Sequence, residues 1–405
     1  MSTAGASRKR ILFVSEAVTL AHVARPAALF ACLDPLRFDA FFAGDPRSQR
    51  FLTISADRVL PLHSIDSKLF AERLRQGKPV YEASNLHDYV VADLALIERI
   101  RPDLIVGDFR LSLSVSARMA RVPYACITNA YWSPFARERS LPLPVLPWTP
   151  YVPLALAQRA FDLIQPVVLA AHCRPLNDVR KAYGLPPLPR DLRSIYTDAD
   201  YTLYADSPEL FPLPDAPPHH LHLGPVLWSP PMAMPAWWDD LPDDRPLVYV
   251  TMGSSGSARL LEVVIDSLAG MGVSVIASTA GAPNPPNRWH NVWLADYLPG
   301  EKAAAKAALV VCNGGSPTSQ QALAVGAPVV GICANMDQML NMRGLAASGA
   351  GIGLRADRLT PSGIVAAVES LLKARGPESE NRAAHGGGAD FSTRFPHYVA
   401  EALSA

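Results

Sequence analysis

Residues 308–333 constrain the fold more than any other part of the chain, because two apolar runs flank a turn of small residues. The run at 308–312 is short and β-branched, which predicts a buried strand. A turn of sequence NGGSPT follows at 313–318, and residues 319–325 are typical of a helix. A strand, a glycine turn and a helix present backbone N–H groups and a helix dipole to an anion. The sequence therefore predicts a phosphate-binding turn.

A second strand and a polar cluster come directly after this helix. Residues 326–328 (Gly-Ala-Pro) end the helix, and residues 329–333 predict the next parallel strand. The chain beyond that strand carries Asp337, Gln338 and Asn341. Open α/β sheets bind ligands at the carboxyl ends of their strands. These residues predict a site for a phosphate ester that carries a hydroxyl-rich group.

The stretch resembles the donor-binding signature of family-1 glycosyltransferases, which have the GT-B fold and take sugars from nucleotide diphosphate donors. That signature reads His-Gly-Gly-x-Gly-Thr-x-x-Glu-Ala-Leu, then Gly-x-Pro, then Asp-Gln-x-x-Asn. The residues that match it in register are Gly314, Gly315, Thr318, Ala322, Leu323, Gly326, Pro328, Asp337, Gln338 and Asn341. The resemblance implies an α/β chain of two Rossmann-like, doubly wound parallel-sheet domains that face each other across a cleft.

Three residues depart from the signature. Asn313 replaces the histidine, Pro317 replaces a turn glycine and Gln321 replaces the glutamate. An asparagine amide can donate to a pyrophosphate oxygen, but without positive charge, and proline has no N–H to offer. An amide binds ribose hydroxyls more weakly than a carboxylate, so Gln321→Glu is expected to tighten donor binding. We expect the departures to lower donor affinity or to change the nucleotide preference.

The resemblance also implies a role for each donor-binding residue. Tyr297 would stack on the base, the Leu298 backbone would pair with the base edge, and Asp337 and Gln338 would hold sugar hydroxyls. The diphosphate would lie among the backbone N–H groups of the turn. The implied set is Ser254, Ser255, Tyr297, Leu298, Asn313, Gly314, Gly315, Ser316, Thr318, Gln321, Asp337 and Gln338. A UDP-sugar is favoured as the donor, and a dTDP-sugar is the alternative.

Two residues near the first domain's predicted strands are candidates for catalysis. His22 lies between a predicted strand at 10–14 and a helix at 26–33, and Asp108 ends a predicted strand at 104–108. Taken alone, they could be a solvated loop histidine and a turn or helix-cap aspartate. The resemblance implies that His22 is the catalytic base and that Asp108 orients its imidazole. Glu16 is a second carboxylate that could take the place of Asp108.

Residues 131–171 are apolar and proline-rich, and the prolines are expected to prevent one long helix. Aromatic residues gather in the first half of this segment. Two interpretations stay open, namely core packing with a connection, or an apolar acceptor pocket. In the second interpretation Tyr131, Trp132 and Phe135 would bind the acceptor.

The domain organisation follows from these assignments. Residues 1–228 are predicted to form an acceptor-binding domain, 229–246 a linker and 247–405 the nucleotide-sugar domain. The last helix, predicted at 396–403, could pack back on the first domain.

Composition narrows the class of protein. The 405 residues carry 37 basic and 37 acidic side chains, so a nucleic-acid partner has no electrostatic support. Five cysteines lack metal-ligand spacing, and no metal or other cofactor is expected. No unbroken apolar stretch reaches membrane-spanning length, although peripheral membrane contact is left open. A cytoplasmic enzyme is expected.

The sequence therefore predicts an inverting, metal-independent glycosyltransferase. It would move a hexose from a nucleotide diphosphate sugar to a hydroxyl of an apolar small molecule. Two alternatives stay open: another GT-B activity such as a nucleotide-sugar epimerase, and a non-catalytic homologue that binds nucleotide sugars.

Overall fold

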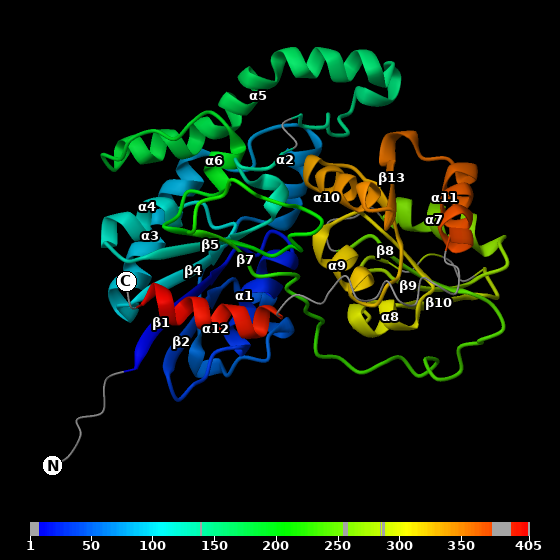
Figure 1. The fold of residues 1–405 in the computed structure, drawn as a ribbon, viewed down its shortest axis with the longest axis horizontal. Coiled ribbons are helices and arrows are strands. Elements are labelled where there is room, and N and C mark those ends of the chain that lie inside the picture. Colours follow the sequence, from blue (N-terminus) through cyan, green and yellow to red (C-terminus); the bar gives the residue numbers. More distant parts are fainter. Residues whose placement is uncertain are drawn as a thin grey trace.

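The computed structural model describes residues 8–137, 140–253, 258–283, 285, 288–374 and 390–403, and it contains two separate parallel sheets (Figure 1). The first sheet has seven strands in the order β3-β2-β1-β4-β5-β6-β7. Its strands are β1 Lys9–Ser15, β2 Phe38–Gly44, β3 Val59–Pro61, β4 Leu104–Asp108, β5 Tyr124–Thr128, β6 Tyr201–Tyr204 and β7 His220–His222.

The second sheet has six strands in the order β10-β9-β8-β11-β12-β13. Its strands are β8 Leu247–Thr251, β9 Ser274–Ser278, β10 Val292–Ala295, β11 Leu309–Cys312, β12 Val329–Cys333 and β13 Gly351–Arg355. In both sheets the strand order reverses next to the first strand of the domain, as in doubly wound folds. The predicted pair of doubly wound parallel sheets is confirmed.

Helices cover both faces of each sheet, which explains why the central strands are buried on both sides. The described helices are α1 Ala21–Ala31, α2 Ser67–Arg75, α3 Ala83–Ile100, α4 Leu113–Ala120, α5 Leu154–Ala182, α6 Leu192–Tyr196, α7 Ala258–Ala269, α8 Gly300–Lys306, α9 Ser316–Ala324, α10 Met336–Ala347, α11 Pro361–Ala374 and α12 Phe391–Ala402. Short 3-10 turns are η1 Pro46–Phe51, η2 Ala56–Arg58, η3 Ala130–Trp132, η4 Thr149–Tyr151 and η5 Ala356–Arg358.

In the first domain, alternate residues of β1 pack into the core layers on opposite faces of the sheet. Ile11 and Phe13 of β1 pack with α1 and α12, while Leu12 and Val14 pack in the layer on the opposite face. This alternation is the two-residue period of a strand. Figure 1 shows α12 lying across the first domain, where Phe395 packs against Phe13 with ring centroids 5.9 Å apart. The last described helix thus packs on the domain in which the chain began.

Helix α5 differs from the sequence-based expectation. Prolines were expected to prevent one long helix, but α5 is a single helix of 29 residues with Pro166 and Pro175 inside it. A proline inside a helix removes one hydrogen bond and bends the axis. Figure 1 shows that α5 changes direction along its length at the outer edge of the molecule. By length and composition alone, α5 is the one helix in the described part of the chain that could cross a membrane.

The segment before α5 reaches from the first domain onto the second. The Arg355 guanidinium donates to the Leu143 carbonyl (2.6 Å), and the Val145 N–H donates to the Ala334 carbonyl (2.9 Å). The Thr149 hydroxyl donates to Asp357 (2.6 Å). Residues 140–151 therefore bridge the cleft between the two domains.

Candidate active site

A cavity of about 360 Å³ lies near the carboxyl ends of both sheets and is lined by residues of both domains. Most of the predicted site residues line it. These are His22, Asp108, Trp132, Tyr297, Leu298, Asn313, Gly315, Ser316, Thr318, Gln321, Asp337 and Gln338. Ser254 and Ser255 lie outside the described residues. The described residues of the predicted catalytic and donor-binding set, apart from Gly314, thus line one interdomain pocket.

His22 and Asp108 form a hydrogen-bonded pair in this pocket. The helix begins at Ala21, earlier than predicted, so His22 lies in the first turn of α1. Its Nδ1 is 2.8 Å from Asp108 Oδ1, and Asp108 is fully buried at the end of β4. A carboxylate on Nδ1 favours the tautomer with the proton on that nitrogen. The other ring nitrogen, Nε2, is then able to accept a proton.

Phe109 holds the imidazole from one side. The two rings stack with centroids 4.5 Å apart and planes 10° from parallel. Phe109 has a φ of 57°, a backbone conformation that bulky residues seldom adopt. Strained residues of this kind gather at functional sites, where the surrounding structure holds them. In this conformation the Phe109 ring lies against the His22 imidazole.

Arg25 is part of the same cluster, although sequence reasoning did not select it. Its Nε donates to Asp108 Oδ2 (2.7 Å) and its second terminal nitrogen donates to Oδ1 (2.9 Å). The same nitrogen lies 3.1 Å from His22 Nδ1. The contact with the Asp108 carboxylate helps to raise the pKa of Arg25 against the opposing effect of burial. The sequence signal that could have identified Arg25 was its spacing from His22, because residues three apart in a helix lie on the same face.

Glu16 does not compete for the role of Asp108. It is fully buried, accepts a hydrogen bond from the Tyr89 hydroxyl (2.9 Å) and pairs with Arg110 at 3.1 Å. Burial raises the pKa of Glu16, and the residue is not part of the pocket lining. Glu16 belongs to the first domain's interior, so the sequence-based suggestion that it could act at the site is wrong.

A chain of buried hydrogen bonds connects this cluster to the second domain. Arg25 donates to Asn129 Oδ1 (2.9 Å), and Asn129 Nδ2 donates to Asp206 Oδ1 (2.8 Å) and to the Ser316 hydroxyl (3.0 Å). The Ser316 hydroxyl also contacts Asp206 Oδ1 at 3.2 Å. Ser316 opens α9, so the histidine cluster and the glycine turn are held in register across the cleft.

Asp206 should make stability depend on pH. Burial raises its pKa from an ordinary value of 3.8 to about 6. A raised folded-state pKa favours the neutral carboxyl, so this contribution to stability is full below about pH 4 and is lost as pH rises through about 6. Relative to Asp206→Asn, the wild type should lose about 2–3 kcal/mol of unfolding free energy between pH 4 and pH 7. Urea denaturation at both pH values measures this difference, and parallel pH profiles would contradict it.

The glycine turn has a conformation that its sequence requires. Gly314 has a φ of 78°, and a Cβ there would lie 2.8 Å from Cys333 Sγ. Asn341 Nδ2 donates to the Gly314 carbonyl (2.9 Å) and to the Ser319 hydroxyl (2.8 Å), while Asn313 Oδ1 accepts the Gly315 N–H (3.0 Å). Asn341, which lies on α10, therefore holds the glycine turn in place. This role explains why the signature contains an asparagine at this position.

The first turn of α9 retains its capacity for an anion in spite of Pro317. The helix begins at Ser316, three residues earlier than predicted, so Pro317 occupies its second position. First-turn N–H groups have no partner within a helix, so proline there removes a donor without breaking a helical bond. The helix dipole and the remaining N–H groups still favour a diphosphate.

Asp337 is held by two aromatic residues of the first domain. Its Oδ1 accepts hydrogen bonds from the Tyr131 hydroxyl (3.0 Å) and from Trp132 Nε1 (2.8 Å). Tyr131 does not line the pocket, and Phe135 packs against His220 with centroids 5.1 Å apart, away from it. The prediction that Tyr131 and Phe135 contact the acceptor is therefore corrected: Tyr131 supports Asp337, and only Trp132 reaches the pocket.

Residues predicted to bind the donor also make hydrogen bonds within the protein. Tyr297 lines the pocket, its hydroxyl donates to the Ala280 carbonyl (3.1 Å), and the Arg50 guanidinium carbon lies 5.9 Å from the centroid of its ring. Gln321 Nε2 donates to the Trp228 carbonyl (2.6 Å) and lies 3.4 Å from the Ser229 hydroxyl. Gln338 Oε1 accepts the Ala334 N–H (2.8 Å). Both amides are thus partly committed to the protein before any donor binds.

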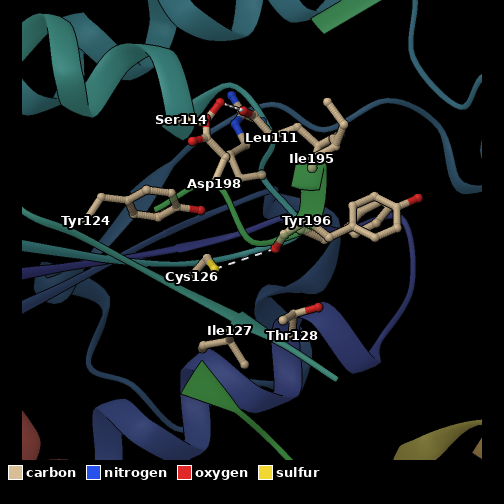
Figure 2. A pocket seen from close by; sticks show the side chains of 11 residues that line it. Leu111, Ser114, Tyr124, Cys126, Ile127, Thr128, Ile195, Tyr196 and Asp198 are labelled. Atoms are coloured by element: carbon tan, nitrogen blue, oxygen red, sulfur yellow. Dashed lines mark hydrogen bonds between the residues drawn. The ribbon is translucent and has the colours of Figure 1, made fainter. Parts of the chain in front are cut away.

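An apolar arm of the pocket extends into the first domain beyond His22. Its walls come from separate elements, and sequence reasoning did not find them. The arm is lined by Phe70, Tyr81, Leu86, Phe109, Trp132, Leu176 and Tyr196. A much smaller cavity of about 20 Å³ lies behind it, next to Cys126 and Tyr196, and cannot hold a substrate (Figure 2).

Within the described ranges, no three or more His, Cys, Asp or Glu residues are grouped to hold a metal ion.

Two doubly wound sheets, with a histidine–carboxylate pair on one and a glycine turn at a helix start on the other, define a glycosyltransferase of the GT-B fold. The fold matches solved structures of such enzymes. "Spinosyn Forosaminyltransferase SpnP" superposes with a TM-score of 0.70 at 17% identity, over 98% of this chain and 100% of that one. "Spinosyn Rhamnosyltransferase SpnG complexed with thymidine diphosphate" gives a TM-score of 0.63 at 19% identity, over 98% and 100%.

The chain belongs to the family of the PGL/p-HBAD biosynthesis glycosyltransferases. Residues 262–402 match the family model "Erythromycin biosynthesis protein CIII-like, C-terminal domain". A "PGL/p-HBAD biosynthesis glycosyltransferase" of Mycobacterium tuberculosis is 49% identical over 98% of this chain and 93% of its own. A "PGL/p-HBAD biosynthesis rhamnosyltransferase" of Mycobacterium bovis is 49% identical over 98% and 88%.

Proposed function

We propose that the protein transfers a deoxyhexose from a dTDP-sugar to the hydroxyl of an apolar phenolic acceptor, with inversion at the anomeric carbon. The observation that carries this proposal is the pocket itself, in which His22 and Asp108 face the glycine turn of the second domain. The relatives are PGL/p-HBAD biosynthesis enzymes and include a rhamnosyltransferase, which supports the choice of substrates. A structural neighbour, the spinosyn rhamnosyltransferase complexed with thymidine diphosphate, supports the choice of nucleotide.

The reaction is a single displacement between the two domains. His22 Nε2 takes the proton of the acceptor hydroxyl while the acceptor oxygen forms a bond to the anomeric carbon. The bond from that carbon to the diphosphate oxygen breaks, and its electron pair leaves with the nucleoside diphosphate. One displacement from the face opposite the leaving group inverts the anomeric configuration. Asp108 stabilises the imidazolium that forms.

The second domain stabilises the leaving group. Its negative charge develops next to the first turn of α9, where the helix dipole is positive. Asn313 lies beside this turn, and Asp337 and Gln338 line the part of the pocket that would hold the sugar. Since Tyr131 and Trp132 occupy one carboxylate oxygen of Asp337, the other oxygen is the one that would accept sugar hydroxyls.

Gln321 supports a deoxyribose-containing donor. Its amide nitrogen donates to the Trp228 carbonyl, so Oε1 is the atom of this amide that would accept a sugar hydroxyl. One acceptor suits the single free hydroxyl of a dTDP deoxyribose better than the two hydroxyls of a UDP ribose. The sequence alone favoured UDP-hexose, and this geometry, together with the relatives, favours dTDP-deoxyhexose instead.

The apolar arm supports a phenolic acceptor. Phe70, Tyr81, Phe109 and Tyr196 present aromatic surface next to His22, and aromatic rings pack well on one another. A phenol has a pKa of about 10, far nearer to that of an imidazole than an aliphatic alcohol's. His22 would therefore take a proton more readily from a phenol than from a sugar or alkyl hydroxyl.

A substrate panel tests the proposed function. Melting temperature is measured with dTDP, UDP and their sugars, because a donor that binds the folded state must stabilise it. Release of the nucleoside diphosphate is then followed with a para-alkylphenol and, as a control, with the matching alkyl anisole, which has no hydroxyl. The proposal is supported if a dTDP-deoxyhexose releases its nucleoside diphosphate only when the phenol is present. Stabilisation by UDP-sugars alone would favour the UDP-hexose donor that the sequence predicted.

Replacing Tyr297 by alanine should weaken donor binding at a cost of about 1–3 kcal/mol, because a stacked base loses its aromatic partner. Calorimetric titration with the nucleoside diphosphate measures this change. Tyr297→Phe is the matched control, since it keeps the ring and removes only the hydroxyl, which bonds the Ala280 carbonyl and accepts from Arg50 at 3.5 Å. Equal affinity in Tyr297→Ala and the wild type would reject stacking at this residue.

Gln321→Glu should weaken donor binding, contrary to the expectation from the sequence. The new carboxylate would face the Trp228 carbonyl oxygen, which lies 2.6 Å from the present amide nitrogen. Losing that bond and leaving a carbonyl unpaired should cost about 1–3 kcal/mol. The donor dissociation constant should rise, and the melting temperature should fall. Tighter binding would show that the amide turns toward the ribose when the donor is present.

A further inference from the structure

Helix α5 carries an exposed aliphatic stripe on its first half. Leu156, Leu163, Ile164 and Val167 recur at spacings of three, four, seven or eight residues, so they lie on one face of the helix. Leu163 is 83% exposed and Val167 is 73% exposed. Only 17% of the most apolar 18-residue window of α5 is buried. Large contiguous apolar surfaces of this kind on a protein mark interaction sites.

We propose that this stripe, which we call the α5 face, inserts into the surface of a phospholipid bilayer. Trp148 and the 86%-exposed Tyr151 stand just before the helix, and such residues favour the boundary between headgroups and acyl chains. Arg159 is exposed within the span of the stripe, and Arg174 is exposed further along the helix, 3.5 Å from Asp178. Both guanidinium groups would meet anionic headgroups. The occupant that this pattern of aliphatic, aromatic and cationic side chains fits is a lipid surface.

The helix lies on the bilayer and does not cross it. Its second half is built into the first domain, where Cys173, Leu176 and Val179 are buried in a core cluster. The segment before it is bonded to the second domain through Thr149. With both ends fixed to the protein, only the exposed face of the first half is free to enter the headgroup layer. Figure 1 shows this half at the outer edge of the molecule, outside both sheets.

The second half of α5 forms part of the pocket wall. His172, Pro175 and Leu176 line the pocket there, and Leu176 belongs to the apolar arm. An acceptor with an acyl chain could keep its chain in the bilayer while its phenol reaches His22. This link to acceptor entry rests on the proposed function, whereas the membrane contact itself rests only on the exposed residues of α5.

Vesicle flotation tests the inference with the full chain. The wild type is mixed with vesicles of phosphatidylcholine alone, or of phosphatidylcholine with phosphatidylglycerol, without any substrate. The test variant is Leu163→Glu with Val167→Glu. The matched control is Leu36→Glu with Val91→Glu, which makes the same charge change at two exposed aliphatic residues elsewhere on the first domain. Melting curves confirm that all three proteins are folded.

We expect the wild type and the control to bind the mixed vesicles, and the α5 variant to bind about tenfold or more weakly. Equal binding of the α5 variant and the wild type, or no binding by the wild type, overturns the inference. A wild type that dimerises in sedimentation, with a monomeric α5 variant and no vesicle binding, assigns the face to a second copy of the chain. Nucleotide release with a soluble phenol, measured on the same samples, shows separately whether the proposed function fails.

Discussion

Replacing His22 by alanine should lower turnover by about 10²–10⁴-fold, the usual contribution of a general base. Donor binding should stay nearly unchanged, because the imidazole faces the acceptor arm and its ring nitrogen is bonded to Asp108 in the first domain. Steady-state release of the nucleoside diphosphate measures turnover, and calorimetric titration measures the donor affinity. A His22→Ala protein with near-normal turnover would remove this histidine from the mechanism.

Asp108→Asn extends this test to the pair. The amide would keep the shape of the side chain, but it would stabilise the imidazolium less than a carboxylate does, so turnover should fall, though by less than in His22→Ala. Since the two residues act as one unit, the double variant should be hardly worse than His22→Ala alone. If the two losses multiply in full, Asp108 acts independently of His22, for example on the acceptor itself.

Replacing Arg25 by methionine should destabilise the protein by about 3–5 kcal/mol, because it leaves the buried Asp108 carboxylate without its guanidinium. Urea denaturation measures the loss. Lys9→Met is the control, since the Lys9–Asp103 pair is exposed and should contribute at most about 1 kcal/mol.

A second variant separates stability from chemistry at Arg25. Arg25→Met combined with Asp108→Leu removes both charges and should recover much of the lost stability, as apolar replacements of buried ion pairs often do. Turnover should stay low because the imidazole has lost its carboxylate. If Arg25→Met is as stable as the wild type, the buried guanidinium is not needed to hold Asp108 in place.

The sequence predicted the sheets well because their strands are buried on both faces. Residues 104–108 were predicted as a strand and form β4 with the same bounds, and 329–333 likewise form β12. Such strands are continuous apolar runs, which sequence patterns detect directly. His22 and Asp108 were found through a family resemblance, and the 2.8 Å contact between them agrees with the predicted pairing.

The partners of these residues could not be predicted because they come from distant parts of the chain. Arg25, Asn129 and Asp206 meet only when α1, β5 and β6 are assembled, and no local motif connects the three residues. The apolar arm has the same origin, since α2, α3, α5 and α6 each supply part of it. Tyr131 was misassigned because an aromatic residue in an apolar segment gives no sign that its hydroxyl will bond Asp337.

Helix α5 shows a different limit of local reasoning. Two prolines argued against one helix, yet the helix continues through both of them. A proline costs less on an exposed helix because the chain can bend and water can take the released carbonyl. The long exposed helix that results is the surface from which membrane contact is inferred.

The anomeric configuration of the product tests the central claim most directly. The protein is incubated with a dTDP-deoxyhexose and a para-alkylphenol, and the product is examined by NMR beside the donor. Single displacement by an acceptor activated by His22 predicts a glycoside of the opposite configuration, one nucleoside diphosphate for each glycoside, and almost no product from His22→Ala. A product that retains the donor's configuration, or no glycoside from any dTDP- or UDP-sugar in the panel, would contradict the account.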